Sequence, residues 1–258
     1  MGISHSTARW VAPVSFAIDF AAQQYGMMSS PNMKDVHDAN LSFWSPQPYF
    51  IAGFFFPQQL FQLAWLYRLW KLDPEKSAEE KKGGRDDGRF CSLLRSWMIF
   101  WNASALKTAN VLVLINSFTQ LYYIFGRLPP MNTRSTSSVL THIVSKTFAG
   151  IGVLDFLHNG SVAYFDHQGP STAVKVLTGL GFGALATSSD WIFGGCLVYD
   201  LIALAVGQRG IGETSWSNLL GIYAVGAAGI VAAKNLARPP YVKQDPSGYE
   251  AASTEDVV

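Results

Sequence analysis

Residues 50–70, Phe-Ile-Ala-Gly-Phe-Phe-Phe-Pro-Gln-Gln-Leu-Phe-Gln-Leu-Ala-Trp-Leu-Tyr-Arg-Leu-Trp, decide the fold. The run is apolar and aromatic, and its one charged residue, Arg68, lies close to its end. About 20 apolar residues, each rising 1.5 Å along a helix, cross a bilayer core of about 30 Å. Trp44, Tyr49, Tyr67 and Trp70 flank the run, where amphipathic rings favour the headgroup zone. We therefore predict a transmembrane helix.

A polar group interrupts this helix just after Pro57. A proline frees the backbone carbonyl one turn before it, and a glutamine amide can satisfy that carbonyl within a membrane. The amides of Gln58, Gln59 and Gln62 therefore have two interpretations: they repair a proline kink, or they form a polar inner face. In the second interpretation Gln58 and Gln62 are candidate substrate-binding residues.

The composition agrees with a membrane protein. The chain has 258 residues, of which 49% are hydrophobic and 14% are charged, against about 25% charged in soluble domains. The net charge of +1 and the lack of a basic stripe exclude a nucleic-acid partner. We expect membrane lipids and a lipid-soluble small molecule as partners.

Further apolar runs on both sides of residues 50–70 predict an all-α, multi-pass transmembrane bundle over residues 1–238. A polar loop at 29–43 separates the first two spans, and Lys and Arg residues place a loop at 71–91 in the cytosol. The polar tail at 239–258 is predicted to be disordered, and we expect an endoplasmic reticulum location. The predicted spans are 9–28, 50–70, 112–125, 138–158, 172–188, 191–208 and 216–236, which makes seven, or eight if residues 92–106 also cross.

Ionisable residues inside these spans are the candidate catalytic groups, because charge is costly in a bilayer. Asp200 has no cation within two helical turns in the sequence, whereas Asp190 is placed to cap the helix that follows it. Asp155 and His158, three residues apart, share one helix face. Asp19 lies within the first span. A carboxyl group in a low-dielectric interior keeps its proton and can act as a general acid.

Other interpretations of these residues remain open. Asp155 can pair with Lys146 or His142 to hold helices together, and His158 can lie at the membrane surface. Aromatic residues, 14% of the chain, are either lipid anchors or walls that stabilise a carbocation beside an acid. The candidate aromatic substrate-binding residues are Trp65, Trp97, Trp101, Tyr122, Trp191 and Tyr199.

Several reaction classes lack support in the sequence. The chain has no CxxC pair and no HExxH, GxSxG, Walker or GxGxxG pattern. Zinc, serine-hydrolase and nucleotide chemistry are therefore not expected. We predict no metal and no cofactor.

Asp-Ala-Asn-Leu-Ser-Phe-Trp-Ser-Pro-Gln-Pro-Tyr-Phe at residues 38–50, followed by Phe-Phe-Phe-Pro-Gln-Gln at 54–59, resembles fungal membrane-bound terpene cyclases of meroterpenoid pathways, of the ascofuranone type. The resemblance covers about residues 35–70. It implies an isomerase or lyase of secondary metabolism that protonates the terminal epoxide of a prenylated phenol. The related indole-diterpene cyclases use a membrane Glu and Asp, whereas no Glu lies in any span here.

Two other function classes remain as alternatives. The stretch at Trp44-Ser-Pro is also similar, over about ten residues, to tryptophan-rich translocator proteins that bind tetrapyrroles and sterols. Such a protein would bind its ligand without converting it. A small transporter or receptor is the remaining alternative, and the lack of an internal repeat counts against a transporter.

Overall fold

The computed structural model describes residues 5–71 and 97–237, and within these ranges the chain is all-helical. The predicted loop beyond Lys71 and the predicted tail at 239–258 lie outside the described residues. The helices are α1 (His5–Met28), α2 (Met33–Ala39), α3 (Pro48–Lys71), α5 (Trp97–Asn102), α6 (Leu106–Gly126), α7 (Thr136–Tyr164), α8 (Thr172–Ser188), α9 (Trp191–Gly210) and α10 (Thr214–Ala237).

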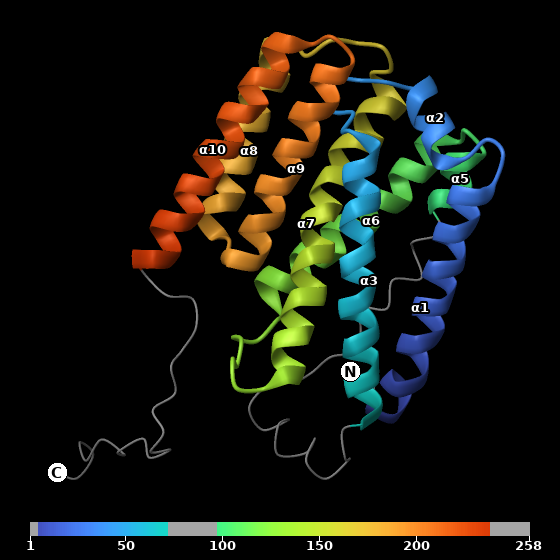
Figure 1. Ribbon diagram of the computed structural model, residues 1–258, viewed down its shortest axis with the longest axis vertical. Coiled ribbons are helices and arrows are strands. Elements are labelled where there is room, and N and C mark those ends of the chain that lie inside the picture. Colours follow the sequence, from blue (N-terminus) through green and yellow to red (C-terminus); the bar gives the residue numbers. More distant parts are fainter. Residues whose placement is uncertain (1–4, 72–96, 238–258) are drawn as a thin grey trace.

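The long helices run side by side as a bundle (Figure 1). Helices α8 and α10 form one side and α1 the other, with α3 and α7 between them. The largest core cluster joins α7, α8, α9 and α10, and its fully buried side chains include Leu154, Leu197, Leu201 and Trp216. Helix α9 is central to this core because it packs against α3, α7, α8 and α10.

Among the helices of the described ranges, α7, α9 and α10 are long and apolar enough to cross a membrane. Large apolar side chains are also exposed on α3, α8 and α10, such as Phe56 (69% exposed), Leu177 (65%) and Val225 (75%). Large exposed apolar surfaces in proteins usually mark contact with a partner or a membrane. These features indicate a membrane protein, whereas the crossing of the other predicted spans stays a prediction.

Most predicted spans coincide with helices. Helix α8 has the predicted bounds of 172–188, and α7 extends the predicted 138–158 to a helix of 29 residues. The predicted short crossing at 92–106 is, in its described part, α5 followed by the start of α6. At six residues α5 is far shorter than a bilayer crossing, and it packs against α1, α2 and α6.

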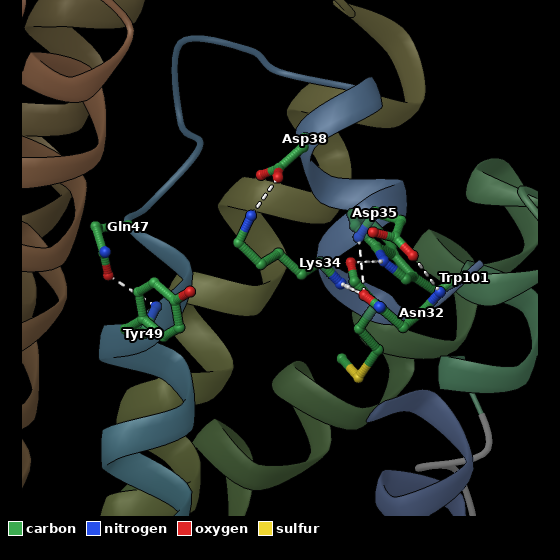
Figure 2. Close-up of polar contacts among 8 residues, drawn as sticks. Asn32, Lys34, Asp35, Asp38, Gln47, Tyr49 and Trp101 are labelled. Atoms are coloured by element: carbon green, nitrogen blue, oxygen red, sulfur yellow. Dashed lines mark hydrogen bonds and ion pairs between the residues drawn. The ribbon is translucent and has the colours of Figure 1, made fainter. Parts of the chain in front are cut away.

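The prediction of a continuous polar loop over residues 29–43 is wrong, because α2 forms within it. Figure 2 shows the reason: the Asn32 side chain accepts hydrogen bonds from the backbone N–H groups of Lys34 and Asp35. The Asp35 carboxylate in turn accepts from the Asn32 N–H, at 3.0 Å, which completes a capping box. The Trp101 indole N–H donates to the Met33 carbonyl and fastens α5 to α2 (Figure 2).

The connection between α2 and α3, residues 40–47, packs against the end of α9. The Gln208 amide donates to the carbonyl oxygens of Ser42 and Ser45, at 2.9 and 3.0 Å. The buried Trp216 indole N–H donates to the Phe43 carbonyl at 2.7 Å. These bonds tie the first helices of the chain to α9 and α10, and they fix α3 relative to the candidate site.

Candidate functional site

Asp200 lies in the middle of α9 and is fully buried, with 0% exposure. Neither of its carboxyl oxygens forms a hydrogen bond within the described ranges. Most buried polar atoms have a partner, because an unpaired one costs about 1–3 kcal/mol. A buried carboxyl without a partner is therefore a candidate functional group rather than a structural one.

Helix α7 brings a second carboxyl to the same region. Asp155 lies close enough to Asp200 for the two groups to interact electrostatically. The two helices approach closely at Gly150, where a Cβ atom would lie 2.2 Å from the Cβ atom of Cys196. Glycine at position 150 therefore sets the spacing between α7 and α9, one turn away from Asp200.

Tyr199, which directly precedes Asp200 in α9, forms an aromatic cluster with Phe50 and Phe54 of α3. The Tyr199 ring centroid is 5.4 Å from that of Phe50 and 5.7 Å from that of Phe54. The Tyr199 hydroxyl donates to the Phe50 carbonyl at 2.7 Å. These contacts bring Tyr199, a predicted site residue, together with two phenylalanines that the sequence analysis did not single out.

The remaining predicted aromatic residues do not join this cluster. Trp65 donates its indole N–H to Thr141 at 3.0 Å, and Tyr122 is 63% exposed. Trp191 is 42% exposed at the start of α9. Trp97 and Trp101 pack together on α5, with ring centroids 6.0 Å apart.

Side-chain amides connect α1 and α3. The Gln23 amide donates to the Asp19 carboxylate at 3.2 Å, and the Gln59 amide donates to the Gln23 carbonyl oxygen. Asp19 is only 4% exposed, so it faces the protein interior.

Gln58 does not repair the backbone at Pro57, because neither atom of its amide has a hydrogen-bond partner in the described ranges. Its side chain is 3% exposed. The buried oxygen of Gln62 likewise has no partner. The repair interpretation of Gln58 is therefore wrong, and its unpaired amide stays a candidate for ligand binding.

His158 is 4% exposed, so its side chain lies inside the protein, and its predicted depth at the membrane surface stays a prediction. Its Nε2 atom lies 3.1 Å from Nδ1 of His37 in α2, and its ring packs 5.3 Å from that of Trp101. One ring nitrogen donates to the other, so the accepting nitrogen carries no proton in this arrangement. His158 thus links α7 to α2 and α5.

We expect the His37–His158 contact to make stability depend on pH. Burial lowers the pKa of His37 from its usual value near 6.5 to about 4, although Asp38 opposes this shift. Below about pH 6 the unfolded chain binds a proton that the folded protein excludes, so stability falls by about 1.4 kcal/mol for each pH unit. The contribution is fully present above about pH 6.5.

Thermal unfolding in detergent between pH 7.5 and pH 4.5 measures this effect. The His37→Asn variant keeps a nitrogen near the position of Nδ1 but removes the titrating ring. Its midpoint should fall less steeply with pH than that of the wild type. Parallel pH profiles for the two proteins would exclude His37 as the source.

Lys146 forms an ion pair with Asp190, and both side chains are largely buried. The predicted pairing of Lys146 with Asp155 is therefore wrong. Asp190 also caps α9, because its carboxylate accepts the Phe193 N–H at 3.1 Å, which confirms its predicted structural role. Within the described ranges, no three His, Cys, Asp or Glu side chains gather as a metal site.

A separate apolar cavity of about 270 Å³ lies between α6, α7 and α8. The hydroxyls of Ser117 and Thr178 in its wall already donate to the carbonyls of Gly152 and Val174, each at 2.7 Å. The cavity therefore offers few free polar groups. The aromatic side chains that line the cavity are those of Trp44, Phe118, Phe156 and Phe182.

Comparison of the chain with protein-family models, with curated proteins and with solved structures finds no match.

Proposed function

We propose that this chain is an integral-membrane terpene cyclase in which Asp200 protonates the terminal epoxide of a prenylated phenol or a similar meroterpenoid precursor. The observation that carries the proposal is the full burial of Asp200 with neither oxygen hydrogen-bonded. Ionising such a group without a partner is costly, so the carboxyl is neutral and can donate a proton. The substrate class comes from the resemblance of residues 35–70.

The reaction needs only proton transfer and rearrangement within the substrate. The Asp200 carboxyl gives its proton to the epoxide oxygen while the carbon–oxygen bond to the more substituted carbon breaks. An alkene or the phenol oxygen of the substrate then attacks that carbon and closes the ring. Loss of a proton from the cyclised cation returns the Asp200 carboxylate to its acid form, so the product is an isomer of the substrate.

Two features near Asp200 support this chemistry. The faces of the Phe50, Phe54 and Tyr199 rings attract positive charge, which lowers the energy of a cation formed beside them. The Asp155 carboxyl adds negative potential when it is ionised. A site that excludes water also prevents capture of the cation as a diol.

The proposal includes a multi-pass arrangement in the endoplasmic reticulum membrane. The proposed spans are α1, α3, α6, α7, α8, α9 and α10, and the six-residue α5 is too short to be another. The basic residues Arg68 and Lys71 at the end of α3 favour a cytosolic position for that end. In this arrangement the substrate enters from the lipid phase.

Feeding an epoxidised farnesyl phenol to microsomes that contain the protein tests the proposal. We expect a cyclic alcohol with the same mass as the substrate. Microsomes without the protein are the control. Unchanged substrate, or a diol that has gained water, would contradict cyclase activity.

A second candidate function, ligand binding without turnover, is favoured by the cavity between α6, α7 and α8. Its apolar wall and paired hydroxyls suit a hydrocarbon ligand, such as the body of a sterol or the edge of a tetrapyrrole. This candidate predicts tight binding of such a ligand and no chemical change in it.

Filling the cavity tests this second candidate. A Cβ atom at Gly181, in the cavity wall, meets no heavy atom within 4 Å, so Gly181→Leu fills space without a backbone clash. Displacing about two CH₂ groups of ligand should weaken sterol binding about tenfold, as measured by sterol titration. Gly183→Leu is the matched control, because Gly183 is equally open but does not line the cavity. Equal affinities for the two variants would exclude this cavity as the binding site.

A further inference from the structure

A second groove, of about 500 Å³, lies between the outer faces of α9 and α10. It is separate from the site at Asp200, which does not line it. Both helices are long and apolar enough to cross a membrane, so the groove faces the bilayer if they do. Its lining changes from polar to apolar along α10, from Asn218 to Val225.

The polar end of the groove contains a positively charged side chain that forms no ion pair with a described residue. The side chain of Arg209, in the last turn of α9, is exposed and makes no ion pair or hydrogen bond with another described residue. Asn218, in the first turns of α10, is likewise exposed and unbonded in the described part of the chain. Ser217 differs, because its hydroxyl already donates to the Ala205 carbonyl at 2.7 Å. Arg209 and Asn218 are thus both free to bind an anion.

The rest of the groove is apolar and open. Ile222 is 64% exposed and Val225 is 75% exposed, and a Cβ atom at Gly221 would meet nothing within 4 Å. The seven-residue step from Asn218 to Val225 is about 10 Å long in a helix. This length matches the upper part of a lipid acyl chain that runs parallel to α10.

We propose that the groove between α9 and α10 binds one phospholipid, with its phosphate on Arg209 and an acyl chain along Gly221 and Val225. Charge complementarity selects this occupant: a guanidinium at the end of a spanning helix lies at the depth of lipid phosphates and binds them through paired N–H donors. A second copy of the chain fits less well. A symmetric contact between parallel copies would bring the two Arg209 side chains to the same depth.

This inference depends on the membrane placement of α9 and α10 and not on the chemistry at Asp200. Its test therefore uses lipid binding as the readout. The purified protein is exchanged into detergent with phosphatidylglycerol, or with diacylglycerol of the same chains, which lacks the phosphate. Native mass spectrometry then measures how much of each lipid stays bound.

We expect one phosphatidylglycerol to be retained in preference to diacylglycerol. Arg209→Gln should lower its retention about fivefold, which corresponds to one basic residue at a membrane surface. Lys175→Gln, at the start of α8, removes a cation at the same end of the bundle and should leave retention unchanged. Equal losses from Arg209→Gln and Lys175→Gln would overturn the assignment of the phosphate to Arg209.

Two substitutions test the apolar part of the groove. Gly221→Leu fills the groove and should lower phosphatidylglycerol retention about tenfold, because about two CH₂ groups lose their contacts. Gly229→Leu is the matched control, since Gly229 is equally open on α10 but does not line the groove. The proposal is wrong if Gly221→Leu retains the lipid, or if its sole effect is to convert a dimer into monomers.

Discussion

Asp200→Asn should lower the rate of cyclisation by about 100-fold or more while the protein remains folded and inserted. The amide has almost the shape of the protonated carboxyl, but it has no acidic proton to give to the epoxide. The expected loss is large because Asp200 is fully buried and neither of its oxygens has a hydrogen-bond partner within the described ranges. Product formation in microsomes, normalised to the amount of membrane-inserted protein, measures the effect.

A second substitution separates a catalytic role from a structural one. Asp200→Leu removes an unpaired polar group from the core, so it should raise the free energy of unfolding by about 1 kcal/mol or more. It should also abolish cyclisation. Asp155→Asn tests the neighbouring carboxyl in the same assay. Wild-type turnover by both Asp200→Asn and Asp155→Asn would defeat the assignment of the acid to this pair.

Gly207→Ala should destabilise the protein by about 1–3 kcal/mol, because its methyl group has no room. A Cβ atom at position 207 would lie 2.5 Å from the Ser45 carbonyl oxygen and 2.5 Å from the Pro46 carbonyl carbon. These are backbone atoms, so α9 and the connection at 40–47 would have to separate. That separation would strain both hydrogen bonds from Gln208.

Thermal unfolding of the purified variants in detergent measures the effect. Gly210→Ala, at the end of the same helix, is the control, because its Cβ atom would meet nothing within 4 Å. Alanine is also the better helix former, so Gly210→Ala should be neutral or stabilising. Equal midpoints for the two variants would show that α9 and residues 40–47 do not pack as closely as described.

The sequence predicts the long helices well because their signals are local. Apolar runs bounded by turn residues mark 172–188 and 216–236, which correspond to α8 and α10. Asp190 is recognisable as a cap because it directly precedes an apolar run. The short α2 is not predicted because most of its seven residues are polar. The three-residue spacing of Asn32 and Asp35 is nevertheless typical of a capping box at the start of a helix.

The surroundings of the candidate site could not be predicted, because they depend on contacts between distant residues. Tyr199 meets Phe50 across 149 positions, and His158 meets His37 across 121. Asp200 itself is recognisable from the sequence, because it is an ionisable residue in an apolar run with no cation within two helical turns. Whether Lys146 neutralises Asp155 or Asp190 is decided only by the packing of α7 against α9.

Infrared spectroscopy of the protein in lipid at neutral pH shows whether Asp200 holds a proton inside the bundle. We predict a carbonyl stretching band of a protonated carboxylic acid that Asp200→Asn removes. Asp190→Asn, which removes an ion-paired carboxylate, should leave that band in place. A spectrum in which Asp200→Asn removes only a carboxylate band would contradict the account.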